Sequence, residues 1–156
     1  MSSGLLPSSS RIVSTPLLGE VTIGVLTLNN FSGRLQWRGR AIPPPDEIAQ
    51  PPGSIIIVLT INAPLDPMIL RRIAARCWAG VARTGSTFAH GSGDIAIAFA
   101  IPNADGACPD SLLWRLDEKD LTPLFIGAAD AVEESIWDCL LAGGLDSRIL
   151  ERFGPT

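Results

Sequence analysis

Histidine and cysteine are scarce in this sequence, and this limits the metal and redox chemistry open to the chain. It has one histidine, His90, and three cysteines, Cys77, Cys108 and Cys139, with no CxxC pair among them. A zinc site or a disulfide framework needs more ligands at closer spacing. We therefore expect no metal, no cofactor and three free thiols in a reducing compartment, which favours a cytoplasmic location.

Positive charge and long apolar runs are also lacking. The net charge is −4, and the eleven arginines and single lysine are scattered apart from a cluster at residues 71–76, whereas nucleic-acid binding usually needs a basic face. The longest apolar runs, residues 55–59 and 95–101, are much shorter than the roughly 18 to 20 residues of a membrane-spanning helix. Residues 1–15 show no basic start followed by an apolar core, so no secretory signal is visible. These features predict a soluble globular domain that binds neither nucleic acid nor membrane.

The common catalytic motifs are absent as well. The sequence contains no GxSxG, no Walker loop, no HExxH and no GxGxxG that opens a helix. His90, Ser92 and Asp94 alternate as H-x-S-x-D, but on an extended segment such side chains are about 6 to 7 Å apart at each step. That separation is too long for hydrogen bonds between a nucleophile and a base, and the pattern favours a structural histidine.

What is present is a set of apolar segments with the lengths of strands and helices. Residues 54–61 are apolar at consecutive positions, which predicts a central strand buried on both faces, and residues 94–101 give a second such strand. Residues 20–30 and 35–38 read as a hairpin with a turn at Ser32 and Gly33. Two helices are predicted, one from Asp66 to a stop at Gly80 and one starting at Thr122 and Pro123 and ending at Gly143. Because buried strands need layers above and below, this order predicts a layered α/β domain.

The junction between a proline-rich segment and the first buried strand suggests a catalytic residue. Residues 43–53 hold five prolines and form an exposed linker in which a chain could be cut. If the Gly53–Ser54 peptide is broken, Ser54 gains an α-amine with a pKa of roughly 7.7 to 8.0 that can accept its hydroxyl proton. Glycine before the serine tolerates the strained backbone of such a self-cleavage. The alternative is that Gly53 and Ser54 only end a loop before a strand.

Four segments together resemble the L-aminopeptidase/D-amino-acid esterase family, which includes the β-peptidyl aminopeptidases. They read GVLTLNNFSG, GSIIIVLTINAPLDPMILRRIA, ARTGSTFAHGSGDIAIAFA and ADAVEESIWDCLLAG, and they occur in the family's order from about residue 8 to residue 143. The resemblance implies a four-layer αββα sandwich of the type found in N-terminal-nucleophile hydrolases and ornithine acetyltransferase. It also implies a precursor that cuts itself into two chains, here residues 1–53 and 54–156 of a single peptidase domain.

The same resemblance implies roles for particular residues. Ser54 is the nucleophile and the new N-terminus, and Ser92 with Asp94 orient it and handle its proton. Some relatives have Glu at the position of Asp94, and a catalytic group displaced by about 1 Å can cost on the order of 10²-fold in rate. Asn30 corresponds to the asparagine of the oxyanion hole, with Asn29 as the alternative because one sequence does not fix the register.

The chain departs from the family pattern at its start, where family precursors have a long preceding segment. We therefore expect a domain that is incomplete at its N-terminus and that associates with itself or with the missing part. The first hypothesis is an aminopeptidase that releases N-terminal residues from small peptides, amides or esters. A second is a non-catalytic remnant that only associates, and a third is an acyltransferase, against which the serine nucleophile argues because ornithine acetyltransferases use threonine.

Overall fold

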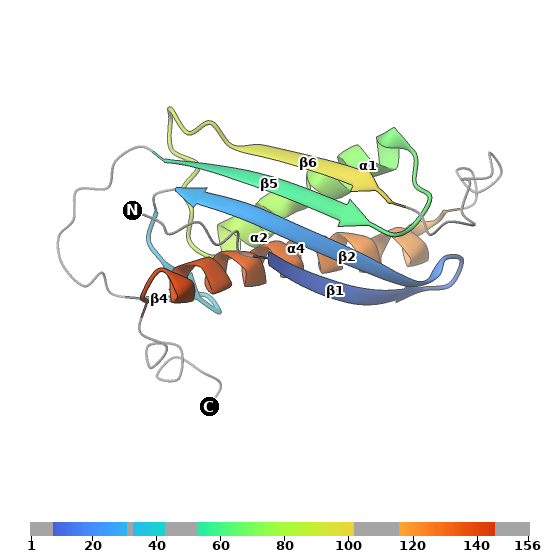
Figure 1. The fold of residues 1–156 in the computed structure, drawn as a ribbon, viewed down its shortest axis with the longest axis horizontal. Coiled ribbons are helices and arrows are strands. Elements are labelled where there is room, and N and C mark those ends of the chain that lie inside the picture. Colours follow the sequence, from blue (N-terminus) through green and yellow to red (C-terminus); the bar gives the residue numbers. More distant parts are fainter. Residues whose placement is uncertain (1–7, 31–32, 43–52, 102–115, 146–156) are drawn as a thin grey trace.

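A four-stranded mixed sheet forms the centre of the fold. The computed structural model describes residues 8–30, 33–42, 53–101 and 116–145. The strands are β1 (Ser8–Thr15), β2 (Gly19–Asn30), β5 (Ser54–Ile61) and β6 (Ile95–Ala100), in the spatial order β1-β2-β5-β6 (Figure 1). β2 is antiparallel to both β1 and β5, whereas β5 and β6 are parallel. The parallel pair requires a crossover between them, which the first two helices provide.

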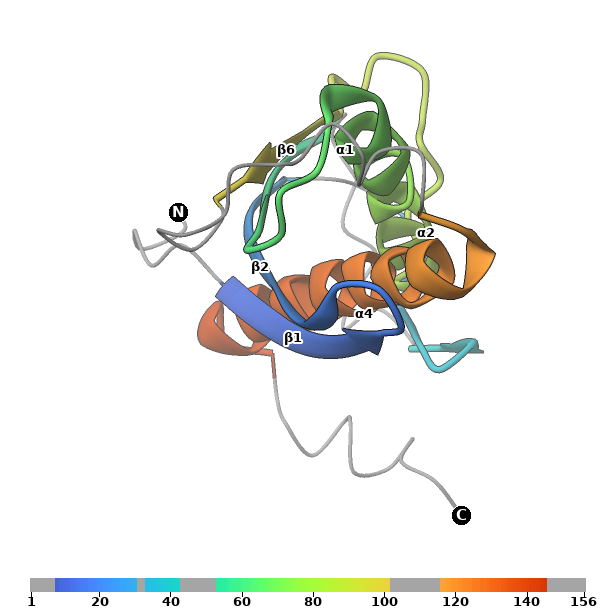
Figure 2. The ribbon, with the colours of Figure 1, turned by 90° about the vertical axis from the view of Figure 1, so that its right-hand side faces the viewer.

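All described helices lie on one side of this sheet (Figure 2). They are α1 (Pro67–Ala74), α2 (Cys77–Arg83) and α4 (Glu118–Ala142). The core between helices and sheet includes Ile23, Ile57, Leu59, Ile73 and Leu124, all fully buried. The result is the layered α/β arrangement that the segment order predicts. None of the described helices has both the length and the apolarity needed to cross a lipid bilayer.

The central strands are covered on one face only, which corrects the prediction of burial on both faces. In β5, Ile55, Ile57, Leu59 and Ile61 face the helices and are buried, while the alternate residues are half-buried or exposed. β6 alternates between exposed and half-buried residues and lies at the edge of the sheet, not at its centre. An apolar run indicates that both faces of a strand can form apolar contacts. It does not indicate that this chain provides the contacting residues on both faces.

Two features of the N-terminal part also differ from the prediction. Residues 8–15, for which no strand is predicted, form β1, and its serine and arginine side chains bond to α4: Ser9 Oγ donates to the carbonyl of Ala131 at 2.5 Å and Arg11 pairs with Glu134 at 3.3 Å. The predicted hairpin between residues 20–30 and 35–38 does not form. Instead, the short strands β3 (Gln36–Trp37) and β4 (Arg40–Ala41) pair with each other. Ser32 of the predicted turn lies outside the described residues.

The first predicted helix is two helices, and Gly80 does not end it. The break falls at residues 75 and 76, and α2 continues past Gly80 to Arg83. A Cβ at position 80 would lie 2.3 Å from the carbonyl oxygen of Ala129 in α4. Glycine is needed there because two helix backbones approach closely, and not as a C-terminal stop.

The long helix starts earlier than the Thr122–Pro123 pair suggests. Asp117 is its N-cap, and its carboxylate accepts hydrogen bonds from the backbone N–H groups of Lys119 at 2.7 Å and Asp120 at 3.3 Å. Asp120 in turn accepts from the backbone N–H of Asp117, so the pair forms a capping box. Pro123 therefore lies inside the helix. The end of the helix at Gly143 agrees with the prediction.

Candidate active site

The ends of three strands lie together at one end of the sheet, and they bring the predicted site residues together. β5 begins at Ser54, and β2 ends at Asn30, which is paired in register with Ser54. β6 runs parallel to β5 and begins at Ile95, directly after Asp94. The sequence separates these residues by up to 64 positions, and the sheet topology places them next to one another.

The Ser54 hydroxyl lies against the loop that precedes β6. The backbone N–H of Gly93 donates a hydrogen bond to Ser54 Oγ at 3.0 Å. The next residue, Asp94, accepts a hydrogen bond through Oδ1 from the backbone N–H of Ile55 at 3.1 Å. These two bonds fix the start of β5 and the residue before β6 relative to each other. Ser54 is half-buried, so its hydroxyl is held in place without being sealed inside the core.

The Ser92 hydroxyl bridges the Gly53 carbonyl and the Asp94 carboxylate. Ser92 Oγ lies 2.6 Å from the carbonyl oxygen of Gly53 and 2.6 Å from Asp94 Oδ1. A hydroxyl has one proton, so it donates to one of these oxygens at a time. Donation to the Gly53 carbonyl would stabilise negative charge that develops on that oxygen when a nucleophile adds to the carbonyl carbon. Donation to Asp94 leaves the Ser92 oxygen free to accept a proton.

The two adjacent asparagines point to opposite faces of the sheet. Because facing residues of an antiparallel pair project to the same side, Asn30 shares the face of Ser54. Asn29 projects to the helix side, where both atoms of its side-chain amide are buried without a hydrogen-bond partner. Of the two alternatives from the sequence, Asn30 is the one on the side of the Ser54 hydroxyl.

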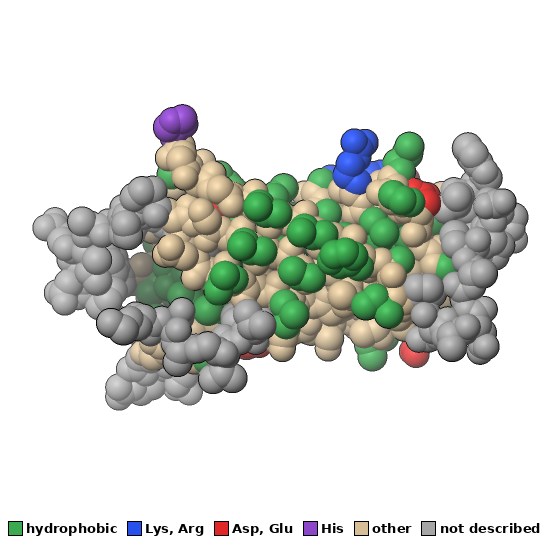
Figure 3. Space-filling view, turned by 45° about the horizontal axis from the view of Figure 1, so that its top comes forward, with side chains coloured by type: hydrophobic (Ala, Val, Ile, Leu, Met, Phe, Trp, Pro, Cys, Tyr) green, Lys and Arg blue, Asp and Glu red, His purple; other side chains and the backbone are tan. Residues whose placement is uncertain are grey.

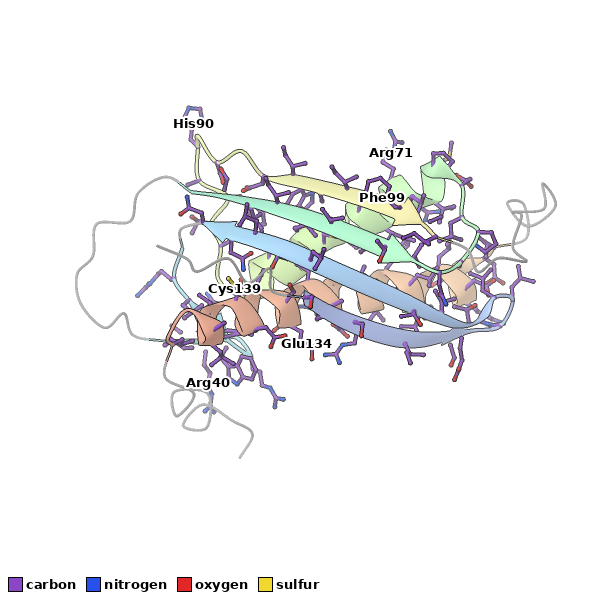
Figure 4. All side chains as sticks on the ribbon, in the orientation of Figure 1. Arg40, Arg71, His90, Phe99, Glu134 and Cys139 are labelled. Atoms are coloured by element: carbon purple, nitrogen blue, oxygen red, sulfur yellow. The ribbon has the colours of Figure 1, made fainter. Side chains whose placement is uncertain are left out.

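The structure corrects the spacing argument about His90, Ser92 and Asp94. The backbone N–H of Ser92 donates to the carbonyl of Ala89 at 3.0 Å, so the segment turns and is not extended. As a result Ser92 and Asp94 contact each other directly. His90 is exposed at the tip of the loop and points away from the sheet (Figure 4). These residues therefore do not form a serine, histidine and aspartate triad. The sequence analysis expected this result, but the reason that it gave, an extended segment, was wrong.

Backbone groups are the part of the site that the sequence analysis missed. The N–H of Gly93 and the N–H of Ile55 both bond to predicted site residues. The only signal for them was the glycine-rich GSGD stretch at residues 91–94. A backbone donor has no residue type of its own, so its position becomes visible only when the chain is folded. Most of the proline-rich linker, residues 43–52, lies outside the described residues.

The described residues contain no cluster of metal ligands, and one of their two free thiols is buried in the core. No three His, Cys, Asp or Glu side chains within the described ranges gather closely enough to hold a metal ion. Cys77 and Cys139 are free thiols, and Cys108 lies outside the described ranges. Burial raises the pKa of the Cys77 thiol to about 12, against a smaller lowering by a backbone hydrogen bond. Because the thiolate is the nucleophilic form, Cys77 is an inert core residue.

A family model described as Peptidase family S58 matches residues 3–145 of the chain. The beta-peptidyl aminopeptidase BapA of Sphingosinicella microcystinivorans is 34% identical over 146 residues, which cover 78% of this chain and 37% of that protein.

Two solved structures are similar to this fold. A protein of Pyrococcus horikoshii OT3 superposes with a TM-score of 0.71 at 32% identity over 96% of this chain and 48% of the other. The L-aminopeptidase D-Ala-esterase/amidase of Ochrobactrum anthropi, described as a prototype for the serine aminopeptidases and a new variant among the Ntn hydrolase fold, gives 0.70 at 28% identity over 95% and 48%. The chain thus spans about half the length of these solved relatives and less of the curated one. The comparison confirms the predicted fold class.

Proposed function

We propose, from the premise that this chain belongs to peptidase family S58, that it acts as a self-processing serine aminopeptidase with Ser54 as nucleophile. The main support for the proposal is the arrangement of side chains around the peptide bond between Gly53 and Ser54. The Ser54 hydroxyl follows this bond directly, the Ser92 hydroxyl contacts its carbonyl oxygen, and the Asp94 carboxylate lies next to Ser92.

The first step of the proposal is cleavage of the chain before Ser54. Ser54 Oγ attacks the carbonyl carbon of Gly53 and its proton passes to the Asp94 carboxylate, while the Ser92 hydroxyl donates its own proton in a hydrogen bond to the carbonyl oxygen. The C–N bond breaks as the proton is delivered to the nitrogen of Ser54, which leaves an ester. Water hydrolyses this ester to a carboxylate on Gly53 and a free amine on Ser54. The products are the chains 1–53 and 54–156 of one peptidase domain.

The second step uses the amine that cleavage exposes. With a pKa of roughly 7.7 to 8.0, the α-amine of Ser54 accepts the hydroxyl proton near neutral pH. The hydroxyl then attacks the first carbonyl of a bound substrate, and Asn30 donates its side-chain amide to the oxyanion. Ser92 and Asp94 position the nucleophile. An acyl-enzyme forms, the leaving amine departs with a proton, and water releases the N-terminal residue.

Small peptides, amides or esters with a free N-terminus are the proposed substrates. The names of the relatives support this class, since one is a beta-peptidyl aminopeptidase and another an aminopeptidase, esterase and amidase. Because the chain spans about half of the solved relatives, the activity is proposed together with association of the chain with itself or with a further segment.

The direct test is the N-terminal sequence of every polypeptide in a purified sample. We expect a fragment that begins at Ser54, together with hydrolysis of aminoacyl nitroanilides that increases as the fragment accumulates. Mass spectrometry measures the first quantity and absorbance of the released nitroaniline the second. An intact chain of 16.5 kDa that hydrolyses none of these substrates would contradict the proposal.

Asn30 and Asn29 provide a matched pair for the oxyanion role. Asn30→Ala is expected to lower kcat by about 10²- to 10³-fold, because it removes a donor of the kind that contributes about 2.7–4 kcal/mol in the transition state. Asn29→Ala is expected to change kcat by less than about 3-fold, since its amide lies on the helix side of the sheet. Steady-state kinetics on one substrate measures both. A larger loss for Asn29→Ala would reverse the assignment.

A non-catalytic protein that acts only by association is the second candidate. The observation that favours it is the uncovered apolar face of the sheet, with Leu28, Ile56 and Phe99 about half exposed. On this hypothesis Ser54→Ala has no effect on any property of the protein, whereas on the first it removes both cleavage and hydrolysis.

A further inference from the structure

The loop that contains Ser92 and Asp94 is exposed along most of its length. Residues 87–91, between α2 and β6, are all exposed, and the part with His90 projects from the body of the protein (Figures 3 and 4). Exposed loops with few packed side chains open at low free energy. The hydrogen bonds around the Gly53 carbonyl nevertheless need Ser92 and Asp94 in one position. Because β6 begins only at Ile95, the loop also needs an anchor on its other side.

Phe88 has a backbone conformation that is unfavourable for its residue type. Its φ is 47°, in the left-handed region, where the Cβ of an L-residue lies too close to a carbonyl oxygen. Arg38 also has a positive φ, but it lies in the tight turn between β3 and β4, which favours this conformation. Phe88 lies outside any turn. A bulky residue keeps such a φ only where its surroundings fix it, and such residues gather at functional sites.

Two contacts hold Phe88 in this conformation. Its ring packs edge to face against Trp78 of α2, with ring centroids 6.1 Å apart and planes at 89°, which is a preferred geometry for aromatic pairs. Its backbone N–H donates to Ser86 Oγ at 3.3 Å. Ser86 in turn forms an antiparallel bridge with Gly33, beyond the end of β2. Phe88 is therefore tied both to α2 and to the segment that follows β2.

The backbone of Phe88 sets the direction of the turn that places Ser92. The turn begins at the next residue, Ala89, whose carbonyl accepts a hydrogen bond from the N–H of Ser92 at 3.0 Å. Gly91 is the third residue of this turn and has a φ of 91°, as a type II turn requires. A change in the φ of Phe88 rotates the whole turn, and the Ser92 hydroxyl moves with it.

We propose that Phe88 is a positioning residue of the site. The contact of its ring with Trp78 keeps its backbone left-handed, and this conformation holds Ser92 and Asp94 in place. The importance of that position rests on the function proposed for Ser54, but the position itself can be measured without any cleavage. If Ser54 acts as proposed, the effect on the rate is large, because a displacement of about 1 Å can cost on the order of 10²-fold.

The test is the rate at which the backbone amide of Ile55 exchanges its hydrogen in the full chain. This N–H donates to Asp94 Oδ1 at 3.1 Å, so its exchange reports whether the carboxylate is in place. Leu59, fully buried in the middle of the same strand, is the reference for opening of the whole sheet. Phe88→Ala and Trp78→Ala are each expected to raise the exchange rate of Ile55 about 10-fold relative to Leu59, since an aromatic pair contributes the equivalent of up to about 12-fold in an equilibrium.

Three further variants separate the ring contact, the backbone conformation and a general loss of packing. Phe88→Tyr keeps the ring and is expected to stay within about 3-fold of the wild-type rate for Ile55. Phe88→Asn loses the ring, but asparagine tolerates a left-handed φ, so its effect should be smaller than that of Phe88→Ala. Phe125→Ala is the matched control, because this half-buried phenylalanine of α4 contacts only the guanidinium groups of Arg72 and Arg76 among the ring and cation contacts of the described residues. It should leave the ratio of Ile55 to Leu59 exchange within about 3-fold.

Three results would overturn the proposal. In the first, Phe88→Ala leaves the exchange of Ile55 unchanged. In the second, it raises the exchange of Ile55 and Leu59 equally, so that the ring only stabilises the fold as a whole. In the third, Phe88→Asn is as harmful as Phe88→Ala, so that the left-handed backbone has no part. Circular dichroism of each variant establishes that the chain is folded.

N-terminal sequencing of the same samples tests the proposed function separately. In Phe88→Ala, cleavage before Ser54 is expected to be about 10- to 100-fold slower than in the wild type. A wild-type chain that is never cut, but that shows the expected exchange of Ile55 in all variants, would contradict the function proposed for Ser54 and support the positioning role of Phe88.

Discussion

Ser54→Ala is expected to yield one uncut chain of 16.5 kDa that hydrolyses aminoacyl nitroanilides at the background rate. Both proposed steps use the same atom, since Ser54 Oγ attacks the Gly53 carbonyl in the first and the substrate carbonyl in the second. Removing a nucleophile typically costs at least about 10³-fold in kcat. The folded state should change little, because among the described residues Oγ accepts one hydrogen bond, from the backbone N–H of Gly93.

A serine outside the site provides the control for this variant. Ser14 is exposed near the end of β1, and Ser14→Ala is expected to be cut and to hydrolyse substrate at the wild-type rate. Intact mass and thermal unfolding of both variants separate a chemical effect from a structural one. A Ser54→Ala chain that is still cut at residue 53, or that retains hydrolysis, would assign the nucleophile to another residue.

The strands β2, β5 and β6 were predictable from the sequence, but their surroundings were not. The run from Ser54 to Ile61 was expected to be a central strand, and it is β5. The prediction that this strand is buried on both faces was wrong for this chain. An apolar run shows what each face can contact, and it does not show whether the contact is present.

Helix ends were less predictable than helix cores. The body of α4 and its end at Gly143 agree with the prediction, but Thr122 and Pro123 were given the role that belongs to Asp117. A proline early in a helical pattern and an Asp-x-x-Asp capping box are both start signals, and the sequence does not rank them. The hydrogen bonds of the Asp117 carboxylate decide between them in the structure.

The side chains of the proposed site were named from the family resemblance, but their mutual geometry could not be predicted. The proximity of Ser54, Ser92 and Asp94 came from the family resemblance. Reasoning from an extended segment gave the wrong separation for Ser92 and Asp94, which lie 2.6 Å apart. Their contact depends on a backbone turn, and the position of Asn30 depends on strand register. Both are properties of the folded chain, so a single sequence contains only indirect signals for them.

Gly85→Ala is expected to have the largest effect on stability of any single methyl addition near the site. Gly85 has a φ of 98°, and a Cβ there would lie 1.8 Å from the carbonyl oxygen of Arg34. This backbone contact is part of a short ladder, in which the N–H of Arg34 donates to the carbonyl of Gly85 and the N–H of Gln36 to that of Thr84, both at 3.0 Å. Alanine would have to break the ladder as well as adopt an unfavourable φ, so we expect a loss of about 3 kcal/mol or more in the free energy of unfolding.

Gly144 separates the two causes. Its φ is 99°, almost that of Gly85, but nothing lies within 4 Å of the position of its Cβ. Gly144→Ala should therefore cost only the conformational strain, about 1–2 kcal/mol, or a few degrees in Tm for a domain of this size. Thermal unfolding, monitored by circular dichroism, measures the Tm of both variants. If Gly85→Ala is insoluble and Gly144→Ala is soluble, the conclusion is the same as from a large difference in Tm.

Equal losses of stability in the two variants would mean that the backbone contact with Arg34 contributes nothing and that φ alone requires glycine at position 85. A larger loss for Gly85→Ala would mean that this contact holds the start of the segment leading to Ser92 and Asp94, and cleavage before Ser54 should slow in the same variant.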